Sequence, residues 1–131
     1  MALNMLVVDD SATMRKMIIR TLRVAGFSLH EIQEAADGLE ALEKLAANDI
    51  DLALLDLNMP GMGGLAALER IRSDPHTRDL PVVVVSTEGS ETRIQLVKSQ
   101  GARFLRKPFT PEDLVAAVAD AIGGIDDDQA E

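Results

Sequence analysis

The sequence predicts one α/β domain: a doubly wound, five-stranded parallel sheet with helices on both faces. A chain of 131 residues, 47% of them apolar, is long enough to bury one hydrophobic core. Short apolar runs alternate five times with stretches of helical periodicity, which is typical of parallel strands joined by right-handed crossover helices. Several of the runs end directly on polar side chains, as strands do at a ligand-binding edge.

The first half of the chain contains three expected strands, at 5–8, 31–36 and 51–56. Ser11 is a suitable N-terminal cap for the first helix, whose apolar residues continue at helical spacing until Gly26 ends it. The second helix follows the turn at Asp37-Gly38 and has three leucines on one side.

In the second half, Leu65, Leu68 and Ile71 mark a third helix, which ends before Asp74-Pro75. The run 81–85 is the plainest strand, a polar helix is expected at roughly 91–99, and a fifth strand at 102–106. The last helix begins at Thr110 with a cap, a proline and two acids, and ends at Gly123-Gly124. We therefore expect one domain at 1–123 and an acidic, disordered tail at 124–131.

Composition excludes several classes of protein. There is no cysteine, so no disulfide or thiolate chemistry is available. The N-terminus has no signal-peptide pattern, and no apolar run reaches the roughly 18 residues of a membrane span. A net charge of -9 argues against general nucleic-acid binding. These observations predict a soluble cytoplasmic protein without nucleic-acid or membrane partners.

Two stretches, 11–30 and 92–111, contain no acid and several basic residues. The first carries Arg15, Lys16, Arg20 and Arg23, and the second carries Arg93, Lys98, Arg103, Arg106 and Lys107. Such stretches can be solvated helix faces or docking surfaces for acidic or phosphorylated partners, and charge alone leaves both interpretations open.

The carboxyl ends of parallel strands meet at one edge of a sheet, and polar residues follow four of the five expected strands. These residues are Asp9 and Asp10, Asp56, Ser86 and Thr87, and Lys107. Each could be an ordinary turn or capping residue by itself, but their convergence favours a site. Three close carboxylates repel one another unless a cation joins them, and Mg²⁺ prefers such oxygen ligands. A lysine and a hydroxyl opposite them suit a phosphoryl group, and Asp56, alone on the central strand, is the best nucleophile candidate.

These motifs resemble the receiver domains of two-component response regulators. Asp9-Asp10, Asp56-Leu-Asn-Met-Pro-Gly-Met-Gly-Gly, Ser86-Thr87 and Lys107-Pro108 follow the first, third, fourth and fifth strands, as in that family. The resemblance covers about residues 3 to 123. Over this length the chain is similar to a stand-alone receiver of the CheY type. It implies a flavodoxin/CheY-like fold with strand order 2-1-3-4-5 and a cis Lys107-Pro108 peptide bond.

The resemblance also implies a role for each residue. Asp56 would accept a phosphoryl group from the phosphohistidine of a histidine kinase or phosphotransfer protein. Asp10, Asp56 and the backbone carbonyl of Asn58 would bind Mg²⁺, with Asp9 acting through water. Lys107 would pair with the phosphoryl oxygens. Ser86 would move towards the phosphoryl group and pull its loop inward.

Further positions concern the output of the switch. Phe104 would be the aromatic switch and lacks the hydroxyl of the usual Tyr. Asn58 and Glu88 would tune the lifetime of the phosphoryl group to seconds or minutes. The face formed by the fourth helix, fifth strand and fifth helix would then bind an output partner, as in chemotaxis. The protein would be a phosphoacceptor rather than an enzyme, and we expect a monomer.

Three alternative functions share parts of this pattern. A phosphorelay shuttle would pass its phosphoryl group to a histidine phosphotransfer protein. A phosphatase resembling haloacid dehalogenases would need an acid two residues after its nucleophile, where this chain has Asn58. A flavodoxin-like flavin protein would need a phosphate loop after the first strand, where Asp9-Asp10 would repel phosphate.

Overall fold

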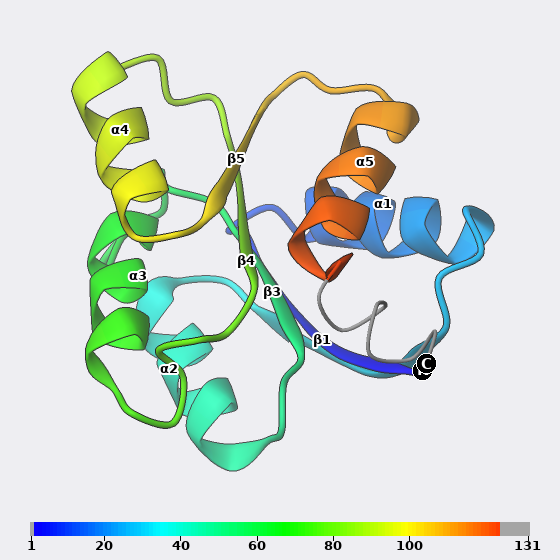
Figure 1. The fold of residues 1–131 in the computed structure, drawn as a ribbon, viewed down its shortest axis with the longest axis horizontal. Coiled ribbons are helices and arrows are strands. Elements are labelled where there is room, and N and C mark those ends of the chain that lie inside the picture. The colour runs from blue at the N-terminus through cyan, green and yellow to red at the C-terminus, as the bar shows by residue number, and fades with distance from the viewer. Residues whose placement is uncertain (1, 124–131) are drawn as a thin grey trace.

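The computed structural model describes residues 2–123 and confirms the predicted α/β fold (Figure 1). Strands and helices alternate along the chain. The strands are β1 (Leu3–Val8), β2 (Leu29–Ala35), β3 (Leu52–Leu55), β4 (Val82–Ser86) and β5 (Arg103–Arg106). The helices are α1 (Ala12–Val24), α2 (Gly38–Ala47), α3 (Gly64–Ser73), α4 (Glu91–Ser99) and α5 (Pro111–Ala121).

The five strands form one parallel sheet in the predicted order β2-β1-β3-β4-β5. Helices α1 and α5 cover one face, whereas α2, α3 and α4 cover the other (Figure 1). The carboxyl ends of all five strands therefore meet at one edge, which we call the carboxyl edge.

The core is divided by the sheet into two layers. Along β3, Ala53 and Leu55 pack towards α2, α3 and α4, while Leu52 and Leu54 pack towards α1 and α5. Successive side chains of a strand point to opposite faces, so a strand covered on both sides reads as a continuous apolar run. All four of these residues are buried, which confirms the prediction of a central strand.

Helix ends follow the local signals in the sequence. The Thr110 side chain accepts a hydrogen bond from the Asp113 backbone N–H, and Asp113 accepts one from Thr110, completing a capping box for α5. Gly26 and Gly101 follow the ends of α1 and α4 with positive φ angles of 98° and 76°. This left-handed conformation closes a helix and favours glycine.

Two strands begin two residues earlier than predicted, β1 at Leu3 rather than at residue 5 and β2 at Leu29 rather than at residue 31. Leu29 is opposite Leu3 in the β1–β2 ladder, with an irregularity in register between Leu3 and Met5. Strand β2 lies at the sheet edge and its first half is largely exposed, so it has no continuous apolar run to mark its start. The tail expected at 124–131 lies outside the described residues. Among residues 2–123, no helix is both long and apolar enough to cross a membrane.

Candidate functional site

Three aspartates meet at the carboxyl edge. Asp9 and Asp10 follow β1, and Asp56 follows β3, its neighbour in the sheet. Each carboxylate contributes an oxygen to a group whose atoms all lie within 4.8 Å of one another. Asp9 and Asp56 are buried, with 2% and 6% of their surface exposed, whereas Asp10 is exposed. Asp56 therefore stands at the predicted strand end but is enclosed there.

Lys107 supplies a positive charge to this acidic cluster. Its Nζ donates a hydrogen bond of 2.7 Å to Asp9 Oδ2 and lies 3.6 Å from Asp56 Oδ2. The lysine follows β5, and its backbone N–H donates to the Ser86 carbonyl at 2.9 Å. The Lys107–Pro108 peptide bond is cis, as the resemblance predicts. One lysine faces three carboxylates, so the cluster retains an excess of negative charge.

Ser86 and Asn58 complete the wall of the site. Asn58 Nδ2 donates to Ser86 Oγ at 3.3 Å, and the Asn58 backbone N–H donates to Asp56 Oδ1 at 3.3 Å. The Glu88 backbone N–H donates to the same Ser86 hydroxyl oxygen at 3.2 Å. Ser86 is fully buried. A chain of hydrogen bonds therefore connects the β4–α4 loop to the Asp56 carboxylate.

A second group, not anticipated as part of the site, fixes the position of Asp9. The Ser11 backbone N–H donates to Asp9 Oδ1 at 2.9 Å, and Arg15 Nη1 donates to the Asp9 carbonyl at 2.6 Å. Arg15 is in turn held by Glu34 of β2, with Nε 2.9 Å from Oε1. Hydrogen bonds from Lys16 and Arg15 hold the pKa of Glu34 below its ordinary value, although burial opposes them, with Lys16 the largest cause. No local signal in the sequence pairs Arg15 with Glu34.

Gly64, at the start of α3, lies directly against the backbone that carries Asp56. A Cβ atom at this position would overlap the Asp56 carbonyl, so a side chain cannot be accommodated without moving the backbone. The Gly64 N–H also donates to the Leu57 carbonyl at 3.0 Å. Gly64 therefore determines how closely α3 approaches the nucleophile candidate.

The donor set fits a hard divalent cation. Such ions take carboxylate and carbonyl oxygens, and Mg²⁺ binds through one or two carboxylates while retaining waters. Burial of Asp9 and Asp56 makes their mutual repulsion costly, and Lys107 compensates only part of it. The acidic cluster is thus consistent with a divalent metal site.

The fold and the acidic cluster define the class of protein. Residues 5–119 match the response regulator receiver domain, and the chain belongs to this family, whose members are phosphoacceptor signalling proteins rather than conventional enzymes.

Curated relatives are chemotaxis proteins. The chain is 40% identical over 114 residues to chemotaxis protein CheY1 of Helicobacter pylori, covering 86% of this chain and 90% of that protein. It is 36% identical over 123 residues to a chemotaxis protein CheY homolog of Campylobacter jejuni, covering 92% and 93%.

Solved structures agree with this relationship. The chemotaxis response regulator CheY4 of Vibrio cholerae superposes with a TM-score of 0.81 at 35% identity, covering 92% of this chain and 99% of that one. A complex of CheX with CheY, BeF3 and Mg from Borrelia burgdorferi gives a TM-score of 0.83 at 30% identity, covering 92% and 89%.

The remaining expected site residues lie close by but face in different directions. Phe104 is opposite Val84 in the β4–β5 ladder, and its half-buried ring packs with the core layer under α2, α3 and α4. The Glu88 carboxylate is turned towards Arg93 of α4. The structure therefore brings Asp9, Asp10, Asp56, Asn58, Ser86 and Lys107 together and places Glu88 at their margin.

Proposed function

We propose that this protein is a single-domain response regulator whose Asp56 carboxylate accepts a phosphoryl group from a phosphohistidine. An Asp56 oxygen attacks phosphorus, the phosphorus–nitrogen bond to the imidazole breaks, and the leaving imidazole nitrogen takes up a proton. The observation that carries the proposal is the enclosed position of Asp56 at the central strand end, 3.6 Å from Lys107 and within reach of two further carboxylates.

Asp56 is favoured over its neighbours because of their contacts. Asp9 already accepts hydrogen bonds from Lys107 and from the Ser11 backbone. Asp10 is exposed, where a phosphorylated carboxylate would lack the enclosing groups. Asp56 accepts only a 3.3 Å hydrogen bond from the Asn58 backbone in the described part of the chain. This leaves Asp56 as the carboxylate both enclosed and available.

The other polar groups of the site would bind Mg²⁺ or the phosphoryl group. Asp10, Asp56 and the Asn58 carbonyl would bind Mg²⁺ directly, and Asp9 would bind it through water. When bound, the ion neutralises part of the charge on the phosphoryl oxygens. Lys107 would donate to a phosphoryl oxygen, and Ser86 would donate its hydroxyl hydrogen to another. Asn58 and Glu88 would border the path of attacking water and limit the phosphoryl lifetime to seconds or minutes.

Movement of Ser86 would transmit the signal. Phosphorylation adds charge at Asp56 and favours the conformation in which Ser86 and Lys107 close on it. The face formed by α4, β5 and α5, with Phe104 as the aromatic switch, would then bind an output protein of a chemotaxis pathway. The receiver domain would comprise residues 1–123.

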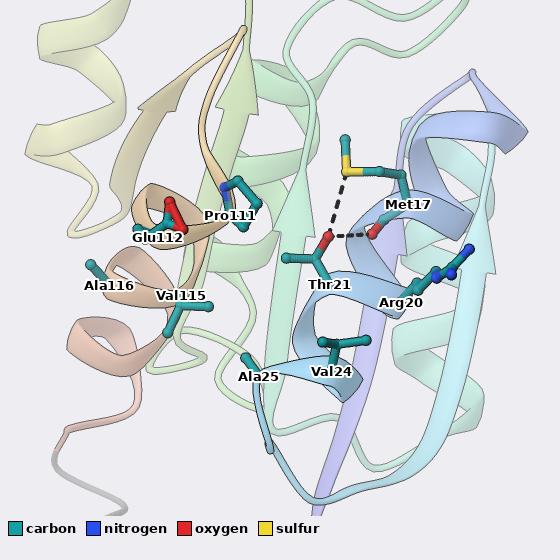
Figure 2. A pocket seen from close by; sticks show the side chains of 9 residues that line it. All are labelled: Met17, Arg20, Thr21, Val24, Ala25, Pro111, Glu112, Val115 and Ala116. Atoms are coloured by element: carbon teal, nitrogen blue, oxygen red, sulfur yellow. Dashed lines mark hydrogen bonds between the residues drawn. The ribbon is translucent and has the colours of Figure 1, made fainter.

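A groove between α1 and α5 is the proposed docking surface for the phosphodonor. Figure 2 shows its lining, which is largely apolar with Arg20 and Glu112 at the margins. The groove has a volume of about 530 Å³, and Val24 and Met17 on its α1 side are 80% and 39% exposed. Both helices begin at the carboxyl edge, α1 after Asp10 and α5 after Lys107. A helix of a histidine kinase or phosphotransfer protein seated here would have its phosphohistidine near Asp56.

Phosphoryl acceptance at Asp56 is tested by measuring the intact mass of the protein after incubation with Mg²⁺ and acetyl phosphate. We expect one added phosphoryl group on the wild type, none on Asp56→Asn, and none when EDTA is added first. Asp79→Asn, which removes an exposed carboxylate elsewhere, serves as the matched control and should label normally. Labelling of Asp56→Asn at the wild-type level would refute the assignment. No labelling of folded wild type by either acetyl phosphate or a phosphorylated kinase would refute the function.

A further inference from the structure

Glu88 is held in the β4–α4 loop through both its side chain and its backbone carbonyl. Its carboxylate Oε1 lies 3.1 Å from Arg93 Nε, and its Oε2 accepts a 3.0 Å hydrogen bond from the Ser90 backbone N–H. Its own carbonyl accepts a 3.2 Å hydrogen bond from Arg106 Nη2. The Glu88 side chain is only 13% exposed. We call Glu88, Arg93 and Arg106 the loop clamp.

The two arginines come from elements on either side of the loop. Arg93 is in the first turn of α4, and Arg106 ends β5, where it is opposite Ser86 in the ladder. The Arg93 side chain is 43% exposed, but its Nε atom is buried, has no hydrogen-bond partner within residues 2–123, and lies 3.1 Å from the Glu88 carboxylate. Losing Glu88 would remove the ion-pair partner of Arg93, and because the Arg93 side chain is partly exposed the cost would be modest.

The loop clamp is connected to the phosphoacceptor site through Ser86. Ser86 Oγ accepts hydrogen bonds from the Glu88 N–H and from Asn58 Nδ2, and the Asn58 N–H contacts Asp56. Closure of Ser86 on a phosphoryl group would lengthen both bonds to its oxygen. Because Glu88 follows Ser86 closely in the chain, closure would also draw Glu88 away from Arg93 and Arg106 and strain its contacts with them.

We propose that Arg93 and Arg106 are positioning residues that stabilise the resting conformation of the β4–α4 loop through Glu88, and so oppose closure of Ser86. The proposal rests on phosphoryl acceptance at Asp56. It assigns these arginines a regulatory role within the receiver, whereas their charge alone left open whether they form a solvated surface or a docking surface.

The expected effect of breaking the loop clamp is a larger fraction of molecules in the closed conformation. A ligand that binds only the closed conformation has an apparent affinity proportional to the fraction of closed molecules. Breaking a partly exposed ion pair that stabilises the resting loop should raise this fraction about two- to fivefold. Damage to the fold would weaken binding, so tighter binding is a result that a merely structural role would not give.

The experiment titrates Mg²⁺-loaded protein with beryllofluoride, a stable mimic of the phosphoryl group, and follows backbone amide signals of residues 86–90 by NMR. Arg93→Ala and Glu88→Gln should each bind about two- to fivefold more tightly than wild type, and the double variant no more tightly than either. Arg93→Lys retains the charge and should restore most of the wild-type affinity. Arg103→Ala removes an arginine of β5 that pairs with Asp120 instead, and should bind as wild type does.

Unchanged or weaker binding by Arg93→Ala, with wild type binding normally, would overturn the loop clamp and leave the proposed function intact. Failure of wild type to bind beryllofluoride would instead overturn the phosphoacceptor site, and the clamp's regulatory role with it. Additive tightening in the double variant would show that Arg93 and Glu88 act separately, which also contradicts the proposal.

Discussion

The arginines of α1 and those of α4 and β5 have different neighbours in the fold. On α1, Arg15 and Lys16 share Glu34 at the carboxyl-edge end of the helix, while Arg20 and Arg23 are exposed and have no ion pair within residues 2–123. On the other side, Arg93 contacts Glu88, Arg103 contacts Asp120, and Arg106 binds the Glu88 carbonyl.

This difference shows which positive charges remain available to a partner. An arginine already paired with a carboxylate offers a partner less net charge, and binding must compete with the existing contact. Within residues 2–123, the distal half of α1 therefore presents two arginines without an ion pair, and one of them, Arg20, lines the apolar groove (Figure 2). The α4–β5 region uses most of its arginines internally. Three predictions test this contrast and are given in order of decreasing size.

Charge reversal on α1 should have the largest effect. The double variant Arg20→Glu/Arg23→Glu should lower the second-order rate of transfer from a phosphorylated histidine kinase about tenfold or more, because it repels an acidic docking segment. Labelling by acetyl phosphate should not change, since Asp56 is untouched. The measurement is transfer of radiolabelled phosphate over time at two salt concentrations.

Lys98→Glu/Arg103→Glu is the matched control, because it makes the same change in net charge on the other region. It should leave the transfer rate within about twofold of wild type, given that these residues lie outside the proposed groove. Equal loss of transfer in both double variants would mean that overall charge, and not the α1 surface, governs docking.

The Glu34 contact should have an intermediate effect, on stability. Glu34→Gln removes the carboxylate that holds Arg15 and Lys16, and should lower the free energy of unfolding at neutral pH by about 0.5–1 kcal/mol. The pKa of Glu34 is lowered in the folded protein, so its stabilisation is present above the unfolded-state pKa and is lost as pH falls through the folded-state pKa. Wild type and Glu34→Gln should therefore have similar free energies of unfolding in acid.

Urea unfolding of both proteins at neutral pH and near pH 3 measures this difference, since ordinary glutamate titrates at about pH 4.3. Glu43→Gln changes an exposed glutamate of α2 without an ion pair in the described residues, and should be neutral at both values. A difference that persisted in acid would mean that Glu34 stabilises the fold by packing and not by its charge.

The Arg103–Asp120 pair should have the smallest effect. Both side chains are at least half exposed, so although their atoms approach to 2.6 Å the pair is screened by solvent. Arg103→Ala should change the free energy of unfolding by less than about 0.5 kcal/mol. A double-mutant cycle with Asp120→Ala isolates the interaction. A coupling well above 1 kcal/mol would show that this region is stabilised by its ion pairs more than its exposure indicates.

Local patterns in the sequence are sufficient to predict the fold and the polar residues that gather at the carboxyl edge. The apolar runs of β1, β3 and β4 are buried on both sides, so their periodicity and their polar ends are local features that can be read directly. Parallel strands joined by right-handed crossovers then leave one edge at which Asp9, Asp56 and Lys107 must meet. The start of β2 was misplaced because an exposed edge strand lacks such a run.

The pairing of the charged groups, in contrast, depends on how distant segments pack. Arg15 reaches Glu34 across two elements, Glu88 turns to Arg93, and Lys107 donates to Asp9 more closely than to Asp56. Likewise, Arg72 of α3 donates to the carbonyls of Gln100 and Leu80, tying α3 to the end of α4. Long side chains have many rotamers, and which one is occupied depends on partners brought near by distant segments of the chain. A one-dimensional pattern of charge therefore reveals which groups are basic, whereas their partners depend on packing.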